Sequence, residues 1–169
     1  MFGDKLKNLK NAAGKAAATA SESIGSTDAV SALTKAIPTE KLNAFAISCK
    51  DMLPDAPEAS DVLDTLPKMH SSLKTFQGSN PAIGAGVTMA STFVRGRIEA
   101  DPLRGGLLSM AEEHGSTVFG EFLTDMQDDD LIMLVILLII LFLIPNPLSD
   151  ILDAAGLVGD IANFLSFLG

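Results

Sequence analysis

The stretch 128-DDDLIMLVILLIILFLIPNP-147 decides how the fold is interpreted. Fourteen consecutive apolar residues, 131–144, follow three aspartates and leave a helix there with no polar face. Such a helix would rise about 21 Å, which is less than the roughly 30 Å hydrocarbon core of a bilayer. Length alone therefore leaves two interpretations open: a segment in contact with lipid, or a helix buried by protein.

The lack of a polar face favours lipid contact. A core helix of a small protein normally keeps a polar stripe, because so small a body rarely surrounds a helix completely. The alternative is a helix buried inside a homo-oligomer, where other copies cover it on all sides. We predict that the run inserts into a membrane, and the expected inserting residues are Leu131, Leu134, Leu138, Leu141, Phe142 and Ile144.

The residues after the run predict a hairpin over 128–169. Pro145, Asn146 and Pro147 are typical of a turn, and the following segment has apolar residues at helical spacing. The aspartates 128–130 are expected to cap the first helix and keep its end in water. They lack the alternating ligands and turn glycine of a calcium loop, so no metal is predicted there.

The stretch 142-FLIPNPLSDILDAAGLVGDIANFL-165 resembles the C-terminal signature of the YkvA-type bacterial membrane domain. The matching positions are Pro147, Asp153, Gly156 and Asp160, with a spacing that differs by a few residues. The resemblance implies a small membrane protein.

The rest of the chain predicts an all-α fold, because no segment alternates apolar and polar residues long enough for a strand. Residues 26–127 indicate several short helices that are broken at Pro54, Pro57 and Pro67. Residues 1–25 indicate an amphipathic helix, which either packs lightly on protein or lies on an anionic membrane. Its expected surface lysines are Lys5, Lys7, Lys10 and Lys15.

Small residues recur four apart in the segment 81–94. Gly84 and Thr88 form one such pair, and Gly86 and Ala90 form another. Because small side chains let helix backbones approach closely, we predict that these four residues mediate helix packing.

The charge distribution limits the partners. Residues 1–104 hold all twelve basic and eleven acidic residues, a net charge of +1, whereas residues 105–169 hold ten acidic and no basic residues. An acidic C-terminal region repels phosphate backbones, so no nucleic-acid partner is expected. The single Cys49 excludes an intramolecular disulfide and is expected to be a small core residue.

No catalytic motif is evident, and the chain has neither Trp nor Tyr. In 111-AEEHG-115 the acids and His114 are adjacent and point in different directions, which favours a solvated helix end over a metal site. We therefore predict a protein that is not an enzyme and has no cofactor and no small-molecule substrate.

The predicted function is structural: a protein without a cleavable signal peptide that inserts its C-terminal segment into a lipid bilayer. It would self-associate or pack with a coat, as in a virion or an organelle shell. Two alternatives remain at this point: a membrane-remodelling or pore-forming protein, and a soluble helical homo-oligomer with a buried apolar tail.

Overall fold

The computed structural model describes residues 28–168 of the chain, and every regular element between them is helical. The predicted all-α fold is thus confirmed. The elements are α3 (Asp28–Ala36), α4 (Thr39–Lys50), α5 (Ala59–Ser79), α6 (Pro81–Arg97), α7 (Ala100–Glu113), α8 (Thr117–Asp125), α9 (Asp128–Phe142), α10 (Ser149–Ala154), α11 (Val158–Phe164) and the 3-10 turn η1 (Leu165–Leu168).

Local sequence signals set several helix ends. Glu58 and Asp61 form a capping box at the start of α5. The side chain of each residue accepts a hydrogen bond from the backbone N–H of the other. Asn80 caps α6, with Pro81 as its first residue. Ser116 caps α8 by accepting from the backbone N–H of Phe119.

The break predicted at Pro67 is wrong, because Pro67 lies inside α5. A proline there removes one backbone hydrogen bond and crowds the preceding turn. Buried side chains on both sides of the proline, among them Leu63 and Leu73, anchor the two halves of α5 to one core. Pro54 and Pro57 lie between α4 and α5, as the sequence predicts.

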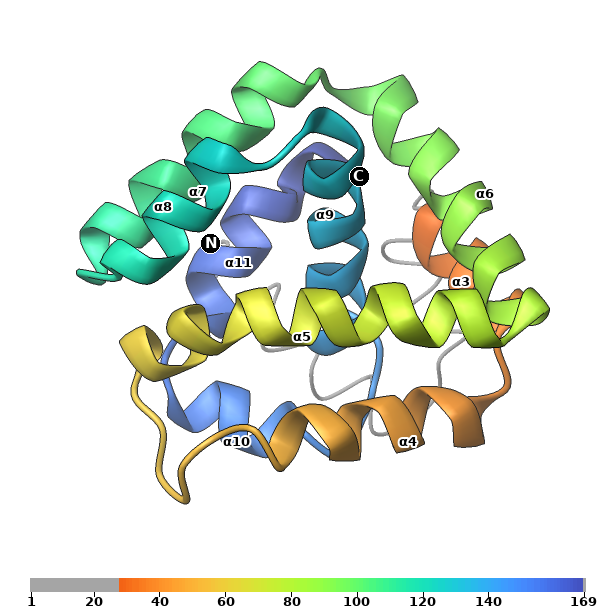
Figure 1. Cartoon of the computed structure of the whole chain (residues 1–169), viewed down its shortest axis with the longest axis horizontal. Coiled ribbons are helices and arrows are strands. Elements are labelled where there is room, and N and C mark those ends of the chain that lie inside the picture. The colour runs from red at the N-terminus through yellow and green to blue at the C-terminus, as the bar shows by residue number, and fades with distance from the viewer. Residues whose placement is uncertain (1–27, 169) are drawn as a thin grey trace.

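The helices are arranged around α9, which runs through the middle of the molecule (Figure 1). Helix α5 crosses in front of it, α6 flanks it on the right, and α7 and α8 form the upper left side. Helices α3, α5, α6, α7, α10 and α11 all pack against α9, and we call these six helices the jacket. The segment after Pro147, residues 148–168, thus folds back onto the body of the protein.

Helices α3 and α6 cross at very short range, and a glycine makes this possible. A Cβ atom built on Gly86 would lie 3.0 Å from the Cβ of Ala36 and 3.1 Å from a side-chain carbon of Ile37. Both Gly86 and Ala90 are buried. The close approach lets α3 cover α6 on the side that also faces the core.

Candidate functional site around helix α9

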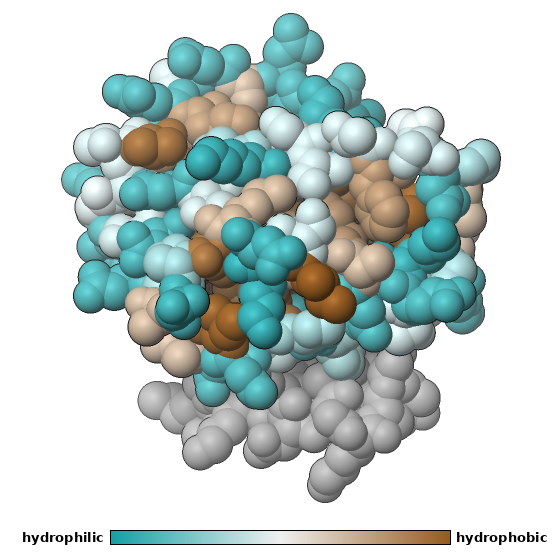
Figure 2. Space-filling view, turned by 60° about the horizontal axis from the view of Figure 1, so that its bottom comes forward, coloured by the Kyte–Doolittle hydropathy of each residue, from teal (hydrophilic) through white to brown (hydrophobic). Residues whose placement is uncertain are grey.

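Helix α9 is enclosed by the chain that carries it. Between Leu131 and Leu141 every residue except Met133 is buried. The all-round apolar surface that favoured lipid contact is therefore covered by the jacket. On the face shown in Figure 2, hydrophobic residues form small patches between hydrophilic ones rather than one continuous apolar strip.

The N-terminal end of α9 is held by charge. Asp128–Asp130, which we call the acid collar, complement the positive end of the helix dipole. Each of the three carboxylates also pairs with a basic side chain from a different jacket helix. The pairs are Asp130 with Lys74 of α5 (3.0 Å), Asp129 with Arg95 of α6, and Asp128 with Arg104 of α7 (3.2 Å).

Arg104 joins three elements at the collar. Its guanidinium donates to Asp128 and also to the backbone carbonyls of Leu123 and Met126, where α8 ends. Only 21% of its side chain is exposed, against 53% for Arg95. Arg104 thus fixes the turn from α8 into α9, whereas Arg95 makes a pair that water can screen.

His70 of α5 makes a buried contact with the same end. Its Nε2 lies 2.8 Å from the backbone carbonyl of Asp130, and since a carbonyl only accepts, Nε2 carries the proton. Burial lowers the pKa of His70 below 6.5, although its hydrogen bond to Asp130 and the charge of that residue act the other way. The ring also meets Phe122 edge-on, with centroids 5.4 Å apart.

The C-terminal end of α9 is held by one neutral side chain. The amide nitrogen of Asn146 lies 2.9 Å from the carbonyl of Leu141 and 2.8 Å from that of Ile144, and its oxygen accepts from the N–H of Leu148. These bonds satisfy carbonyls that a helix leaves unpaired at its end. The predicted turn at 145–147 therefore both ends α9 and starts the return to α10.

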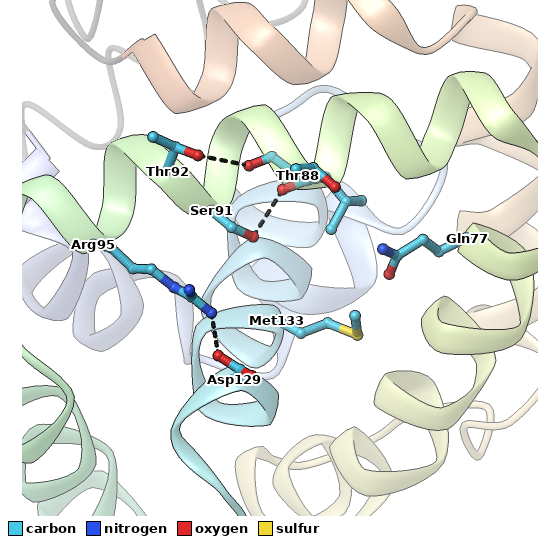
Figure 3. A pocket seen from close by; sticks show the side chains of 8 residues that line it. Gln77, Thr88, Ser91, Thr92, Arg95, Asp129 and Met133 are labelled. Atoms are coloured by element: carbon cyan, nitrogen blue, oxygen red, sulfur yellow. Dashed lines mark hydrogen bonds and ion pairs between the residues drawn. The ribbon is translucent and has the colours of Figure 1, made fainter.

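A groove opens onto α9 between α5 and α6 (Figure 3). It has a volume of ≈ 240 Å³, and Met133, a partly exposed residue of the apolar run, lies at its edge. The Arg95–Asp129 pair closes one side, and Gln77 lies on the other (Figure 3). The groove is thus a window in the jacket next to the acid collar.

The other residues singled out in the sequence lie apart from this site or in its wall. Gly84 approaches the end of α5, Thr88 lines the groove, and the four lysines between residues 5 and 15 lie outside the described residues. The remaining expected inserting residues are placed as follows: Leu131, Leu134, Leu138 and Leu141 are buried on α9, Ile144 is buried just after it, and Phe142 is partly buried. Cys49 is buried in α4, and burial raises the pKa of its thiol to about 12.

Sequence reasoning missed the residues that hold the collar: Lys74, Arg95 and Arg104. A signal was present in the charge distribution, because a region with acids and no bases must take its partners from the earlier part of the chain. Which bases pair with which acids depends on contacts between residues 24 to 56 positions apart, and no local pattern encodes these.

Comparisons of the chain with protein families, with characterised proteins and with solved structures found no match. Within residues 28–168, no helix combines the length and hydropathy that crossing a bilayer requires. The fold and site together define a helical domain with a jacketed apolar helix, anchored by charge at one end and by an amide at the other.

Proposed function

We propose that the protein is a non-enzymatic membrane-inserting protein that stores its inserting helix, α9, inside the jacket. The observation that carries the proposal is the combination of an all-round apolar helix with polar anchors at its two ends. Contacts along the shaft of α9 are apolar and non-directional, so lipid tails can replace them. The directional bonds that keep α9 in place lie at the ends, where water or a membrane surface can reach them.

The energetics require an apolar destination for α9. Ten of its side chains are buried, and burying one aliphatic side chain stabilises by about 1.5–3 kcal/mol. Exposing all ten to water would cost about 15–30 kcal/mol, which exceeds the about 5–15 kcal/mol that stabilises a typical domain. Helix α9 can therefore exchange its jacket for lipid or for another protein, and not for water.

The depth of insertion follows from the length of the run. A rise of about 21 Å passes the middle of a roughly 30 Å hydrocarbon core without reaching its far side. Asn146 and the two flanking prolines would then lie within the bilayer or lead the chain back to its entry side. We therefore propose a hairpin that enters the bilayer from one side, passes its middle and returns to the same side, with the acid collar left at the surface.

Insertion is tested by labelling α9 through its window. Met133→Cys places a single reactive thiol on α9, because the buried Cys49 with its raised pKa stays protonated near neutral pH. The labelled protein carries an environment-sensitive dye and is mixed with phosphatidylcholine–phosphatidylglycerol vesicles that contain lipid-attached quenchers. We expect quenching at position 133, and more of it when the quencher lies near the head groups, because position 133 is only about 4.5 Å of helix rise from Asp130 at the surface.

The matched control is Ile47→Cys on the outer face of α4, where the side chain is 49% exposed. Quenching at 133 and not at 47 supports insertion of α9, whereas an unquenched dye at 133 on bound vesicles overturns it. A collar variant with Asp128→Asn, Asp129→Asn and Asp130→Asn is expected to insert faster, because its three ion pairs with the jacket are lost. Release of a trapped dye from the same vesicles distinguishes pore formation from anchoring.

A second candidate function is self-association through α6. Met89 and Phe93 lie one turn apart on this helix and are 52% and 36% exposed. Ala85 is exposed one turn earlier on the same face, so small and apolar side chains form a stripe that a second copy could cover. This stripe favours a homo-oligomer whose contact surface lies on α6. Helix α9 is then already covered within each chain.

Sedimentation analysis tests the stripe directly. Met89→Lys together with Phe93→Lys is expected to convert an oligomer to a monomer without changing helicity. Val118→Lys on α8 is the matched control, because Val118 is 48% exposed and lies on another surface. A wild-type protein that sediments as a monomer across the concentration range rules this function out.

A further inference from the structure

The end of α7 forms a rigid corner that fixes the position of His114. Gly115 has a φ of +70°, its N–H donates to the carbonyl of Glu112, and the N–H of Ser116 donates to that of Ala111. These two bonds are the Schellman ending of a helix, which a residue with left-handed backbone completes. Ser116, the residue after Gly115, is already the N-cap of the next helix, α8. Only His114 and Gly115 lie between the last residue of α7 and this cap.

Helix α11 brings a third ligand group to this corner. Asp160 lies in its first turn, and its Oδ2 is 2.6 Å from Nε2 of His114. A carboxylate oxygen of Glu113 is 4.0 Å from the same nitrogen, and one ligand atom from each of the three residues lies within 4.8 Å of the other two. Side chains from two helices, far apart in the sequence, thus converge on one point.

The packing of the two helices keeps this convergence in place. A Cβ atom built on Gly106 of α7 would lie 3.0 Å from two ring carbons of Phe164 of α11. Glycine at position 106 therefore lets the ring lie directly on the backbone of α7. The contact is about one turn of α11 beyond Asp160, so it sets the distance between the helices at the cluster.

We propose that Glu113, His114 and Asp160 form a binding site for a divalent transition-metal ion, with Zn²⁺ as the best fit. The two carboxylates balance the charge of the ion, and an imidazole nitrogen selects Zn²⁺ over Mg²⁺ or Ca²⁺, which prefer oxygen ligands. The chain has no Lys or Arg after Arg104, so cations for this acidic region come from elsewhere in the fold or from solution.

Small movements convert the cluster into a metal site. Ligand atoms about 2.0–2.2 Å from a tetrahedral Zn²⁺ lie about 3.3–3.6 Å from one another. The distance between His114 Nε2 and Asp160 Oδ2 would increase from 2.6 Å, and the carboxylate of Glu113, whose side chain is 62% exposed, would move closer to His114 than its present 4.0 Å. Water completes the fourth position, and the ion then fastens α11 to the end of α7.

Zinc titration of the untagged full-length protein tests the site by calorimetry and thermal melting. The wild-type protein is expected to bind about one Zn²⁺ and to melt at a higher temperature in its presence, reversibly with a chelator. His114→Gln and Asp160→Asn each keep a hydrogen-bonding group and are expected to weaken Zn²⁺ binding by about tenfold or more. Glu112→Gln, one residue outside the cluster, is the matched control and should bind as the wild type does.

Two outcomes overturn the proposal. The first is an unchanged melting temperature and no heat of binding when Zn²⁺ is added to the wild-type protein. The second is equal binding by the wild type, His114→Gln and Asp160→Asn, which means that scattered surface carboxylates hold the ion. A melt without Zn²⁺ shows whether each variant is folded, so loss of binding is separated from loss of structure.

Discussion

The shaft of α9 and its two ends are stabilised in different ways. The shaft, Leu131–Leu141, is held by buried apolar area and makes no use of charge. The ends are held by directional bonds: ion pairs to three separate helices at the collar, and the amide of Asn146 at the other end. Apolar area provides cohesion without fixing position, whereas the bonds at both ends fix position, and the ion pairs of the collar also respond to salt.

The same difference separates contacts that another apolar medium can replace from contacts that need particular partner groups. Any apolar medium of suitable thickness can replace the jacket along the shaft. The collar needs bases at three defined places, and Asn146 needs the carbonyls at the end of its own helix. Substitutions along α9 should therefore fall into two groups, distinguished by the size of the effect and by its dependence on ionic strength.

The largest effect is expected in the shaft. Leu138→Ala removes a fully buried side chain from the middle of α9 and leaves a cavity among the jacket helices. The free energy of unfolding should fall by about 2–5 kcal/mol. Urea denaturation at low and at high salt measures it, and a loss that depends strongly on salt would contradict an apolar origin.

Asn146→Ala tests the neutral end. The carbonyls at the end of α9 lose their amide partner, and Leu148 loses the acceptor of its N–H. We expect a loss of about 1–3 kcal/mol, because partly buried polar groups are left without their bonds. Asn146→Asp is an informative companion, since it keeps the acceptor for Leu148 and removes the donors. A variant as stable as the wild type would show that water satisfies this end.

The collar is tested by comparing two arginines. Arg104→Ala removes bonds to two backbone carbonyls and to Asp128, so it should cost about 1–3 kcal/mol. Arg95→Ala removes an exposed ion pair and should cost about 0–1 kcal/mol, with the loss disappearing at high salt. Equal losses for both variants, measured by urea denaturation, would mean that exposure does not determine how much each pair contributes.

How far the sequence predicts this molecule depends on the range of the contacts. The all-α class, the caps at Asn80 and Ser116 and the turn around Asn146 all follow from neighbouring residues. The path of α5 through Pro67 does not, because tertiary packing on both sides outweighs the local cost. For the same reason the sequence predicts the apolar character of α9 and not the jacket that covers it.

The metal cluster shows the same limit at a smaller scale. The adjacent residues Glu113 and His114 do not by themselves predict a metal site. The third proposed ligand, Asp160, lies 46 residues after His114. They meet because α7 and α11 pack on one another, with Phe164 lying on Gly106. Local patterns therefore identify where helices begin and end, and long-range packing decides which side chains meet.

The smallest expected effect is a change in pH dependence at the collar. Burial lowers the pKa of His70 in the folded protein below its ordinary value of 6.5, so the unfolded chain binds more protons between the two pKa values. Stability contributed by neutral His70 is present above about pH 6.5 and is lost as the pH falls towards the folded pKa. A proton on His70 would also face Lys74 one turn away, although Asp130 offsets that repulsion.

His70→Gln isolates this contribution. Glutamine keeps an N–H that can reach the carbonyl of Asp130 and does not titrate, so the variant should lose stability less steeply between about pH 7.5 and pH 5.5. His114 is present in both proteins, and therefore the difference between the two curves belongs to His70. Urea midpoints across this range measure the difference. Parallel curves would show that the collar end of α9 does not sense pH through His70.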